Sequence, residues 1–297
     1  MGLLNKKETA VQNITLMSIM SAINVVISVL STLMLSVAPI ISVLLIIILP
    51  LTSTIIALFC KTKYYPIYTF ASIGLAMVAT LWNMEHTLFY LVPSIITGFI
   101  FGLLIKHKIH HAFSIGIVTL IQTGIIYSMI PLLNLLYGTN FIDVIKAIFK
   151  SNAINYAMPT LVMLVSLVQT TLSLIVVTNE VRKLGEYNVE NLPNMWVLPV
   201  ISLFFILIGG ALLFVSISWS YAMIFMSLIF SIEATCILIK TKVKITLIGF
   251  GISILISIIL FSVFYTRINE TYALSLLALY PLLNNISSIV VSFLIKK

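Results

Sequence analysis

The segment that decides the fold runs from residue 82 to residue 111 and reads WNMEHTLFYLVPSIITGFIFGLLIKHKIHH. Its central 19 residues, 87–105, carry no charge. That length matches the roughly 20 apolar residues that a helix needs to cross a bilayer. Lys106 and Lys108 follow this run, and basic residues are retained in the cytoplasm during insertion. We therefore expect a membrane-spanning helix with a cytoplasmic basic end and an outward end near Trp82.

The composition extends this expectation to the whole chain. Of the 297 residues, 61% are hydrophobic and 8% are charged, and the mean hydropathy is +1.21. A soluble domain carries about 25% charged residues, so the bilayer must be the main solvent of this chain. Spans in lipid must satisfy their backbone hydrogen bonds internally. The sequence thus predicts an all-α, polytopic transmembrane helix bundle with the lipid bilayer as a partner.

Charges, prolines and turn residues divide the chain into about ten spans. The first apolar run is longer than the roughly 7–15 residues of a signal-peptide core, so we expect it to remain as an uncleaved span. The expected spans are residues 14–35, 39–60, 66–81, 87–105, 112–135, 155–178, 197–215, 219–239, 245–264 and 272–295.

The distribution of basic residues predicts the orientation. Ten spans place both termini on one side of the membrane. If that side is the cytoplasm, 13 of the 16 Lys and Arg residues are cytoplasmic, and only Lys146, Lys150 and Arg267 lie outside. This is the pattern of topology signals, and it makes a nucleic-acid partner unnecessary to explain the positive charge. We expect a multi-pass protein of the bacterial cell membrane with both termini cytoplasmic.

Two connections are longer than the others. The outer one, residues 136–154, contains FIDVIKAIFK at 141–150, whose charged and apolar residues separate onto two helical faces. We interpret it as an interfacial helix, either a surface connector or a lid. The cytoplasmic one, residues 179–196, separates six spans from four, so we expect membrane regions at 1–180 and 181–297.

Known catalytic and cofactor motifs are missing from the sequence. It contains no phosphate-binding G-x-x-x-x-G-K-[ST] loop, no H-E-x-x-H and no paired C-x-x-C. We therefore expect no enzymatic activity and no cofactor. His107, His110 and His111 stand among lysines that would repel a metal cation, so we interpret this cluster as an anchor for anionic lipid rather than a metal site.

Polar residues within the expected spans are the first candidates for a site. An unpartnered amide in hydrocarbon costs several kcal/mol, so these side chains should face the bundle interior. They either form interhelical hydrogen bonds or line a polar cavity. Glu233 is the one ionisable residue well inside a span, and it is either a functional carboxylate or a residue that reaches toward Lys240 and the cytoplasm. The amides are those of Asn24, Gln122, Gln169, Asn284 and Asn285.

A second set of candidates lies at the outer ends of spans four to six. Aromatic rings beside amides and a carboxylate are suited to capturing a small polar molecule, although an aromatic interfacial belt explains the same residues. We expect an outward-facing pocket with Gln122 and Gln169 near its floor. The residues of its rim and walls are Asn83, Glu85, Tyr90, Tyr127 and Asn155.

Small residues mark two packing faces. Gly98 and Gly102 are one helical turn apart and should let a neighbouring helix, the first or second span, approach their backbone closely. Ser18 and Ala22 form a similar small-xxx-small pair in the first span.

The first six spans resemble the membrane-embedded substrate-binding (S) subunits of energy-coupling-factor transporters. The resemblance rests on these small residues, on the GFIFGLLIK segment at 98–106 and on the end of the sixth span near residue 178. With four further spans and LPNMWVLP at 192–199, the whole chain looks more like the related YybS-like family of bacterial membrane proteins. The resemblance implies a six-helix S-subunit-like core plus four C-terminal helices. It also implies that Ser18 and Ala22 dock on a transmembrane coupling subunit that works with ATPases.

The resulting hypothesis is a non-enzymatic membrane protein that binds a small polar molecule from outside and takes part in its uptake. Two alternatives remain open. In the first, the protein is a self-sufficient secondary transporter with five-plus-five inverted repeats. In the second, it is a membrane scaffold or sensor.

Overall fold

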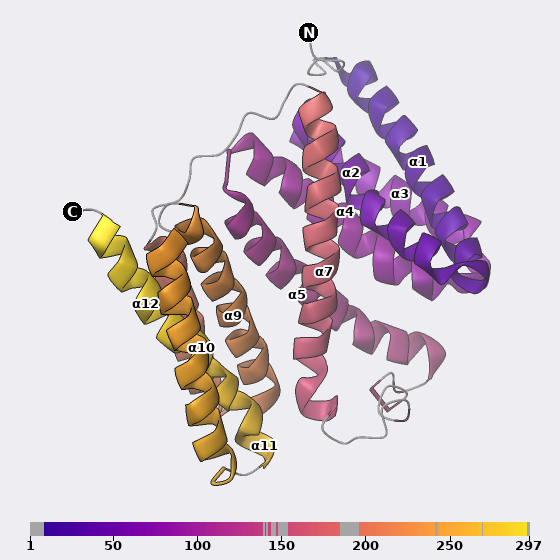
Figure 1. Ribbon diagram of the computed structural model, residues 1–297. Helices are drawn as coiled ribbons and strands as arrows, with labels where there is room; N and C mark the ends of the chain where they lie inside the picture. Colours follow the sequence, from indigo (N-terminus) through magenta and orange to yellow (C-terminus); the bar gives the residue numbers. More distant parts are fainter. Residues whose placement is uncertain are drawn as a thin grey trace. The chain divides into compact units, whose positions relative to one another are not determined.

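Figure 1 shows the computed structural model, which describes residues 9–138, 140, 142–143, 147, 154–184, 196–240, 243–268 and 270–295. Throughout these residues the regular elements are helices. Ten of the helices have at least 15 residues and follow the order of the expected spans. They are α1 (Ala10–Val37), α2 (Pro39–Phe59), α3 (Tyr65–Ala79), α4 (Met84–Lys106), α5 (His111–Tyr137), α7 (Ile154–Lys183), α8 (Val197–Leu212), α9 (Ile217–Ile239), α10 (Val243–Tyr265) and α12 (Leu279–Ile295).

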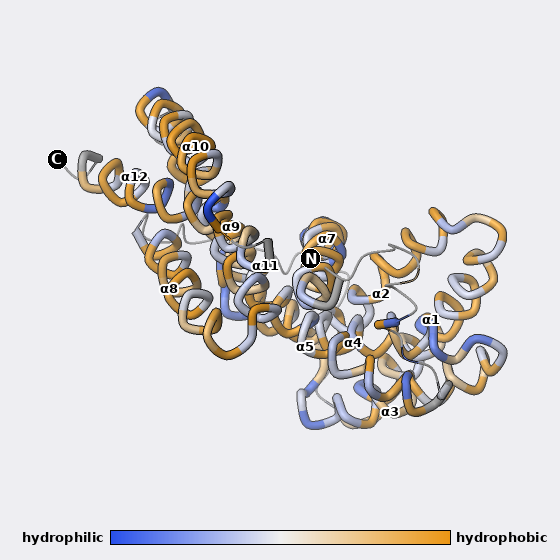
Figure 2. The backbone as a smooth tube through the Cα atoms, turned by 90° about the horizontal axis from the view of Figure 1, so that it is seen from below, coloured by the Kyte–Doolittle hydropathy of each residue, from blue (hydrophilic) through white to orange (hydrophobic). Residues whose placement is uncertain are grey.

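Eight helices in the described part of the chain are long and apolar enough to cross a membrane. The two long helices outside this set are shorter, with 15 residues in α3 and 16 in α8. Figure 2 shows hydrophobic residues along most of the helical length and hydrophilic residues concentrated near the turns. The chain is therefore a multi-pass, all-helical membrane protein, as predicted, while the number of spans stays a prediction.

Local chemistry explains where several helices begin and end. Thr9 and Gln12 form a reciprocal capping box, so α1 begins four residues before the expected span. Pro39 occupies the first turn of α2, where a missing N–H costs nothing. At its C-terminal end, α7 continues beyond the expected end at residue 178 as far as Lys183. The Lys183 ammonium lies 2.6 Å from the Glu180 carboxylate.

The last expected span is not one continuous α-helix. Residues 272–295 are divided among α11 (Glu270–Ala273), a 3-10 segment at Leu274–Ala278 and α12. Pro281 lies in the first turn of α12. Because proline has no N–H, it cannot continue the α-helical hydrogen bonding back into the preceding turn, which favours a break there.

The packing divides the chain into two units: Met1–Thr139 with Val165–Asn191, and Asn140–Leu164 with Leu192–Lys297. In the first unit α2 packs against α1 and α4, α1 packs against α3, and α4 packs against α5. In the second, α8 packs against α9, and α12 packs against α8, α9 and α10. The division at residues 1–180 and 181–297 remains a prediction.

Two expectations fall largely outside the described residues. Of the expected outer helix at 141–150, only residues 142, 143 and 147 are described. Of the expected cytoplasmic loop at 179–196, only residues 179–184 and 196 are described.

Candidate functional site

The amide of Asn24 belongs to a hydrogen-bonded cluster that joins α1, α2 and α3. Its Nδ2 donates to the Tyr68 hydroxyl oxygen over 2.7 Å, and its Oδ1 accepts from the Thr52 hydroxyl over 2.7 Å. The Ser53 hydroxyl lies 3.0 Å from the same Tyr68 oxygen, and all four side chains are buried. Both ends of the Asn24 amide are thus partnered inside the protein. We call these four residues the Asn24 cluster.

A second amide group joins α4, α5 and α7 within the same unit. Gln122 Nε2 donates to Gln169 Oε1 over 2.6 Å, and Gln122 Oε1 accepts from the Thr170 hydroxyl over 3.0 Å. Gln169 Nε2 reaches the Ser94 hydroxyl oxygen only at 3.5 Å. Gln122 is 1% exposed, whereas Gln169 is half-buried. Two amides that are 47 residues apart in the sequence therefore meet side by side. We call these four residues the Gln122–Gln169 group.

The three helices of this group also carry buried polar atoms without a hydrogen-bond partner. Among the described residues they are Thr119 Oγ1 on α5, Ser166 Oγ and Thr160 Oγ1 on α7, and His86 Nε2 on α4. Thr160 lies in the part of α7 that belongs to the second unit. Thr119 and Ser166 each precede a glutamine of the pair by three residues, so each lies about one turn from it on the same helix face. Leaving such an atom unpaired in a buried site costs about 1–3 kcal/mol. Within the part of the chain that the structure describes, no side chain supplies a hydrogen bond to these atoms.

The face of α4 extends the polar groups toward the beginning of that helix. His86, Tyr90 and Ser94 stand four residues apart and therefore share one face. The rings of His86 and Tyr90 have centroids 4.8 Å apart. Eight residues separate His86 from Ser94, a distance of about 12 Å along the axis. A polar seam thus connects the first turn of α4 with the glutamine pair.

For most of the other predicted rim and wall residues, the structure gives the position along the helices and the burial of the side chain. Asn83 is the N-cap residue of α4 without a side-chain capping bond, and Glu85 follows in the first turn. Both are half-buried, as are Tyr90 and Tyr127. Of Asn155, only its place in the first turn of α7 is described. Whether these residues surround one pocket with the glutamines remains a prediction.

Close packing fixes α4 against α2. A Cβ atom added at Gly98 would collide with the carbonyl oxygen of Pro50, and one added at Gly102 would collide with the Cβ of Ala57. The partner is α2, one of the two helices predicted from the sequence. Thr54, on the same face of α2, donates to the Gly98 carbonyl oxygen over 2.8 Å. This contact holds Ser94, one turn from Gly98, at a fixed place.

The small residues of α1 line a groove. A cavity of about 170 Å³ lies between α1 and α3, and Ser18 and Ala22 are on its α1 side. Ile67 of α3 and Tyr64, the residue just before α3, are among the residues on its other side. The groove borders the Asn24 cluster, because Tyr68 also lines it.

The remaining amides form a separate group inside the second unit. Asn284 Nδ2 donates to Ser231 Oγ over 2.7 Å and to Thr235 Oγ1 over 2.9 Å, which joins α12 to α9. Asn285 Nδ2 donates to Ser202 Oγ over 2.6 Å, which joins α12 to α8, while its buried Oδ1 has no hydrogen-bond partner. The intramembrane amides therefore bond in three groups.

Glu233 is half-buried on α9, and Lys240 on the same helix interacts with it electrostatically. Both interpretations of this carboxylate stay open. Among the described residues, no cluster of three or more His, Cys, Asp and Glu residues is suited to hold a metal ion.

The comparisons with known proteins add no relative: no family model, no curated protein and no solved structure matches this chain.

Four hydroxyl residues near the glutamines were not among those predicted from the sequence, although their spacing gave a signal: Ser94, Thr119, Ser166 and Thr170. Each stands three or four residues from another polar residue of the seam, or directly beside one, which is the spacing of a shared helical face. Serine and threonine are common in membrane spans, because they bond back to their own helix, so their spacing alone was not distinctive.

Proposed function

We propose that this protein binds a small polar molecule within the membrane as a component of an uptake system, in the manner of the S subunits that its first 180 residues resemble. The ligand would contact the polar seam of α4 together with the Gln122–Gln169 group. The polar rim at Asn83 and Glu85 would lie at the entrance. The protein itself would perform no covalent chemistry.

One observation supports this function above others. Among the described residues, the buried atoms His86 Nε2, Thr119 Oγ1 and Ser166 Oγ lack hydrogen-bond partners, and they lie on the three helices that the Gln122–Gln169 group joins. Buried polar atoms are normally paired, so a concentration of unpaired ones calls for a bound polar molecule or ordered water.

The available groups define the chemistry of the ligand. Hydroxyls both donate and accept hydrogen bonds, a neutral imidazole nitrogen does one or the other, and a glutamine amide offers both functions. None of these groups carries a fixed charge. A neutral or weakly charged molecule with several hydrogen-bonding groups fits them best, and a flat ring would stack on Tyr90 or Tyr127.

The same proposal assigns the groove between α1 and α3 to a partner. Ser18 and Ala22 line it, and small residues let another helix approach closely in lipid. In the resembled family, this face docks on a transmembrane coupling subunit that is served by ATPases.

Native mass spectrometry of the full chain, extracted from its own membrane, tests both parts of the proposal. We expect one small molecule to remain bound and partner subunits to copurify. Gln169→Leu should lose the small molecule, whereas Asn284→Leu, an equally drastic change to a buried amide in the second unit, should retain it. Retention by both variants would rule out the glutamine site.

A transport assay separates the proposal from its main alternative. Once the bound molecule is identified, proteoliposomes that contain the purified chain alone should bind it without accumulating it. Accumulation driven by an ion gradient would instead identify a self-sufficient secondary transporter.

The proposed orientation has its own test. Cysteines introduced at Lys108 and Arg267, in a background without Cys60 and Cys236, should react differently with a membrane-impermeant maleimide in intact cells. We expect labelling at position 267 and protection at position 108, because the positive-inside pattern places them on opposite sides. The reverse result would invert the topology.

A further inference from the structure

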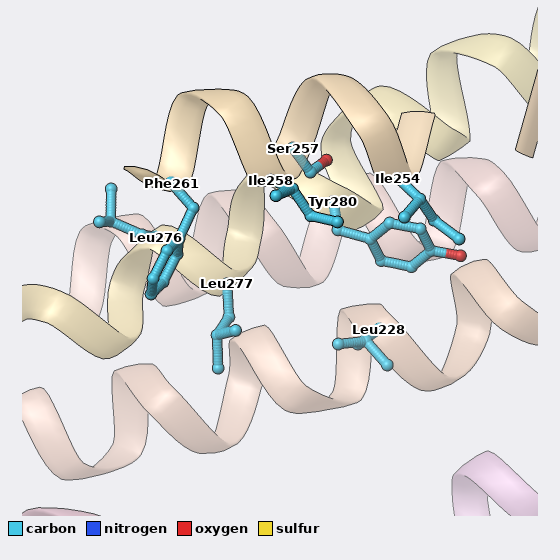
Figure 3. Close-up of a pocket in the computed structure, with 8 residues that line it drawn as sticks. All are labelled: Leu228, Ile254, Ser257, Ile258, Phe261, Leu276, Leu277 and Tyr280. Carbon is cyan, nitrogen blue, oxygen red and sulfur yellow. The ribbon is translucent and has the colours of Figure 1, made fainter. Parts of the chain in front are cut away.

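A second cavity, in the second unit, has an unrelated chemical character. It has a volume of about 400 Å³ and lies among α9, α10, the 3-10 segment at Leu274–Ala278 and α12. Figure 3 shows its lining, which includes Leu228, Ile254, Phe261 and Leu276 as well as the ring of Tyr280. Among the described residues of the lining, Ser257 is the other polar side chain, and its hydroxyl already donates to the Ser253 carbonyl oxygen over 2.6 Å.

The packing of α10 explains why this cavity exists. A Cβ atom at Gly249 would collide with the hydroxyl of Ser287, so α10 and α12 are in close contact there. The rings of Phe250 and Tyr280 meet edge to face, with centroids 6.0 Å apart. Further along α10, the cavity lies beside the segment from Ile254 to Phe261, where such close contacts would otherwise be. These two residues are seven positions apart, so the cavity extends along about 10 Å of the helix.

The surroundings of α10 determine which molecules reach the cavity. Most residues of α10 are not buried inside the protein. The side chains of Leu255 and Ile259, for example, are 61% and 53% exposed. In a membrane, this face of α10 meets lipid. Water does not occupy an apolar cavity of this kind, because too few polar partners are available to it. An empty space of this size would also forfeit the dispersion contacts of its walls.

We propose that an acyl chain of a membrane phospholipid occupies this cavity and completes the packing of α10 against α9 and α12. Arg267 supports a phospholipid as the source of the chain. It is exposed and lies in the turn that follows the end of α10 at Tyr265, beyond Phe261. A phosphate near the guanidinium would let the chain enter past Phe261, which is half-buried, and reach Leu276 inside the cavity. This site is independent of the proposed polar site.

Photo-crosslinking with a phosphatidylglycerol that carries a diazirine in its acyl chain tests the proposal. The full chain would be reconstituted in vesicles of this lipid, irradiated and mapped by peptide mass spectrometry. Leu276 is only 9% exposed, so lipid outside the cavity should not reach it. We expect crosslinks at Leu276 in addition to those on the exposed face of α10. Labelling of Leu255 and Ile259 without Leu276 would overturn the proposal.

Cavity-filling variants sharpen the test. Ser257→Phe places a ring in the cavity and should remove most of the crosslinking at Leu276. The matched control, Ile259→Phe, places the same ring on the lipid-exposed face of the same helix and should leave it unchanged. Ile254→Phe serves as a second filling variant if Ser257→Phe does not fold. Equal crosslinking of Leu276 in a folded filling variant and in the control would contradict an acyl chain in the cavity.

Discussion

The Asn24 cluster and the Gln122–Gln169 group use similar side chains within one unit but differ in how completely those side chains are partnered. Every polar end of the Asn24 amide meets a hydroxyl at 2.7 Å. Around the glutamine pair, Gln169 Nε2 has only a 3.5 Å contact, and the hydroxyls of Thr119 and Ser166 have no partner among the described residues. The Ser28 hydroxyl, one turn from Asn24 on α1, is also unpartnered, so the contrast rests on the contacts of the amides themselves. A saturated cluster stabilises the packing of helices. An unsaturated one has hydrogen-bonding capacity left for a ligand.

The largest expected effect concerns the contact that links the two regions. Gly98→Leu forces a side chain against the Pro50 carbonyl oxygen of α2, the helix that also supplies Thr52 to the Asn24 cluster. We expect a loss of about 3 kcal/mol, at the upper end for overpacking of a close interface. Unfolding by SDS in mixed micelles would measure it. Gly124→Leu is the control, since a Cβ atom there meets nothing within 4 Å. Equal losses in the two variants would refute a close approach of α4 to α2.

The Asn24 cluster itself should show the next largest effect. Asn24→Leu leaves the Thr52 and Tyr68 hydroxyls without their amide partner in a buried site. Unsatisfied buried groups of this kind suggest a cost of about 2 kcal/mol. The same SDS titration would measure the free energy of unfolding. A change no larger than that of an exposed substitution such as Leu33→Ala would show that the cluster does not stabilise the fold.

A pair of near-isosteric changes compares the two regions directly. Thr52→Val removes a hydroxyl that donates to Asn24, and we expect a cost of about 1 kcal/mol. Thr119→Val removes an unpartnered hydroxyl, so stability should stay the same or rise slightly. Thermal unfolding in one detergent would rank the two variants. If Thr119→Val is the more destabilising change, the hydroxyl of Thr119 has a partner in the resting protein and the contrast between the regions fails.

The smallest effect on stability is expected at His86. His86→Phe keeps an aromatic ring beside Tyr90 but removes the unpartnered Nε2. Replacing an unsatisfied buried polar group by an apolar one of similar shape is nearly neutral for folding. The melting temperature should therefore hardly change, whereas retention of the bound small molecule in native mass spectrometry should fall. A variant that melts normally and retains the molecule fully would remove His86 from the site.

Several features of the fold were predictable because they depend on local sequence. The uncharged run at 87–105 lies within α4, and the basic residues at its end coincide with the end of that helix at Lys106. Helix formation in lipid depends on the length of an apolar run and on backbone hydrogen bonds within it. Both are properties of consecutive residues, so they can be predicted from the local sequence. The Thr9 capping box accounts for the early start of α1, and Pro281 accounts for the break in the last expected span.

The sequence also determined that buried amides exist, since Asn24, Gln122 and Gln169 all stand inside apolar runs. Only the tertiary structure decided their partners. Asn24 bonds with Tyr68 across 44 residues, and Gln122 bonds with Gln169 across 47. Such pairs depend on how each helix is rotated about its axis and which neighbour it meets. A one-residue shift turns a side chain by about 100°, away from its partner. The distinction between a saturated cluster and one with unpartnered atoms therefore arises from packing between helices.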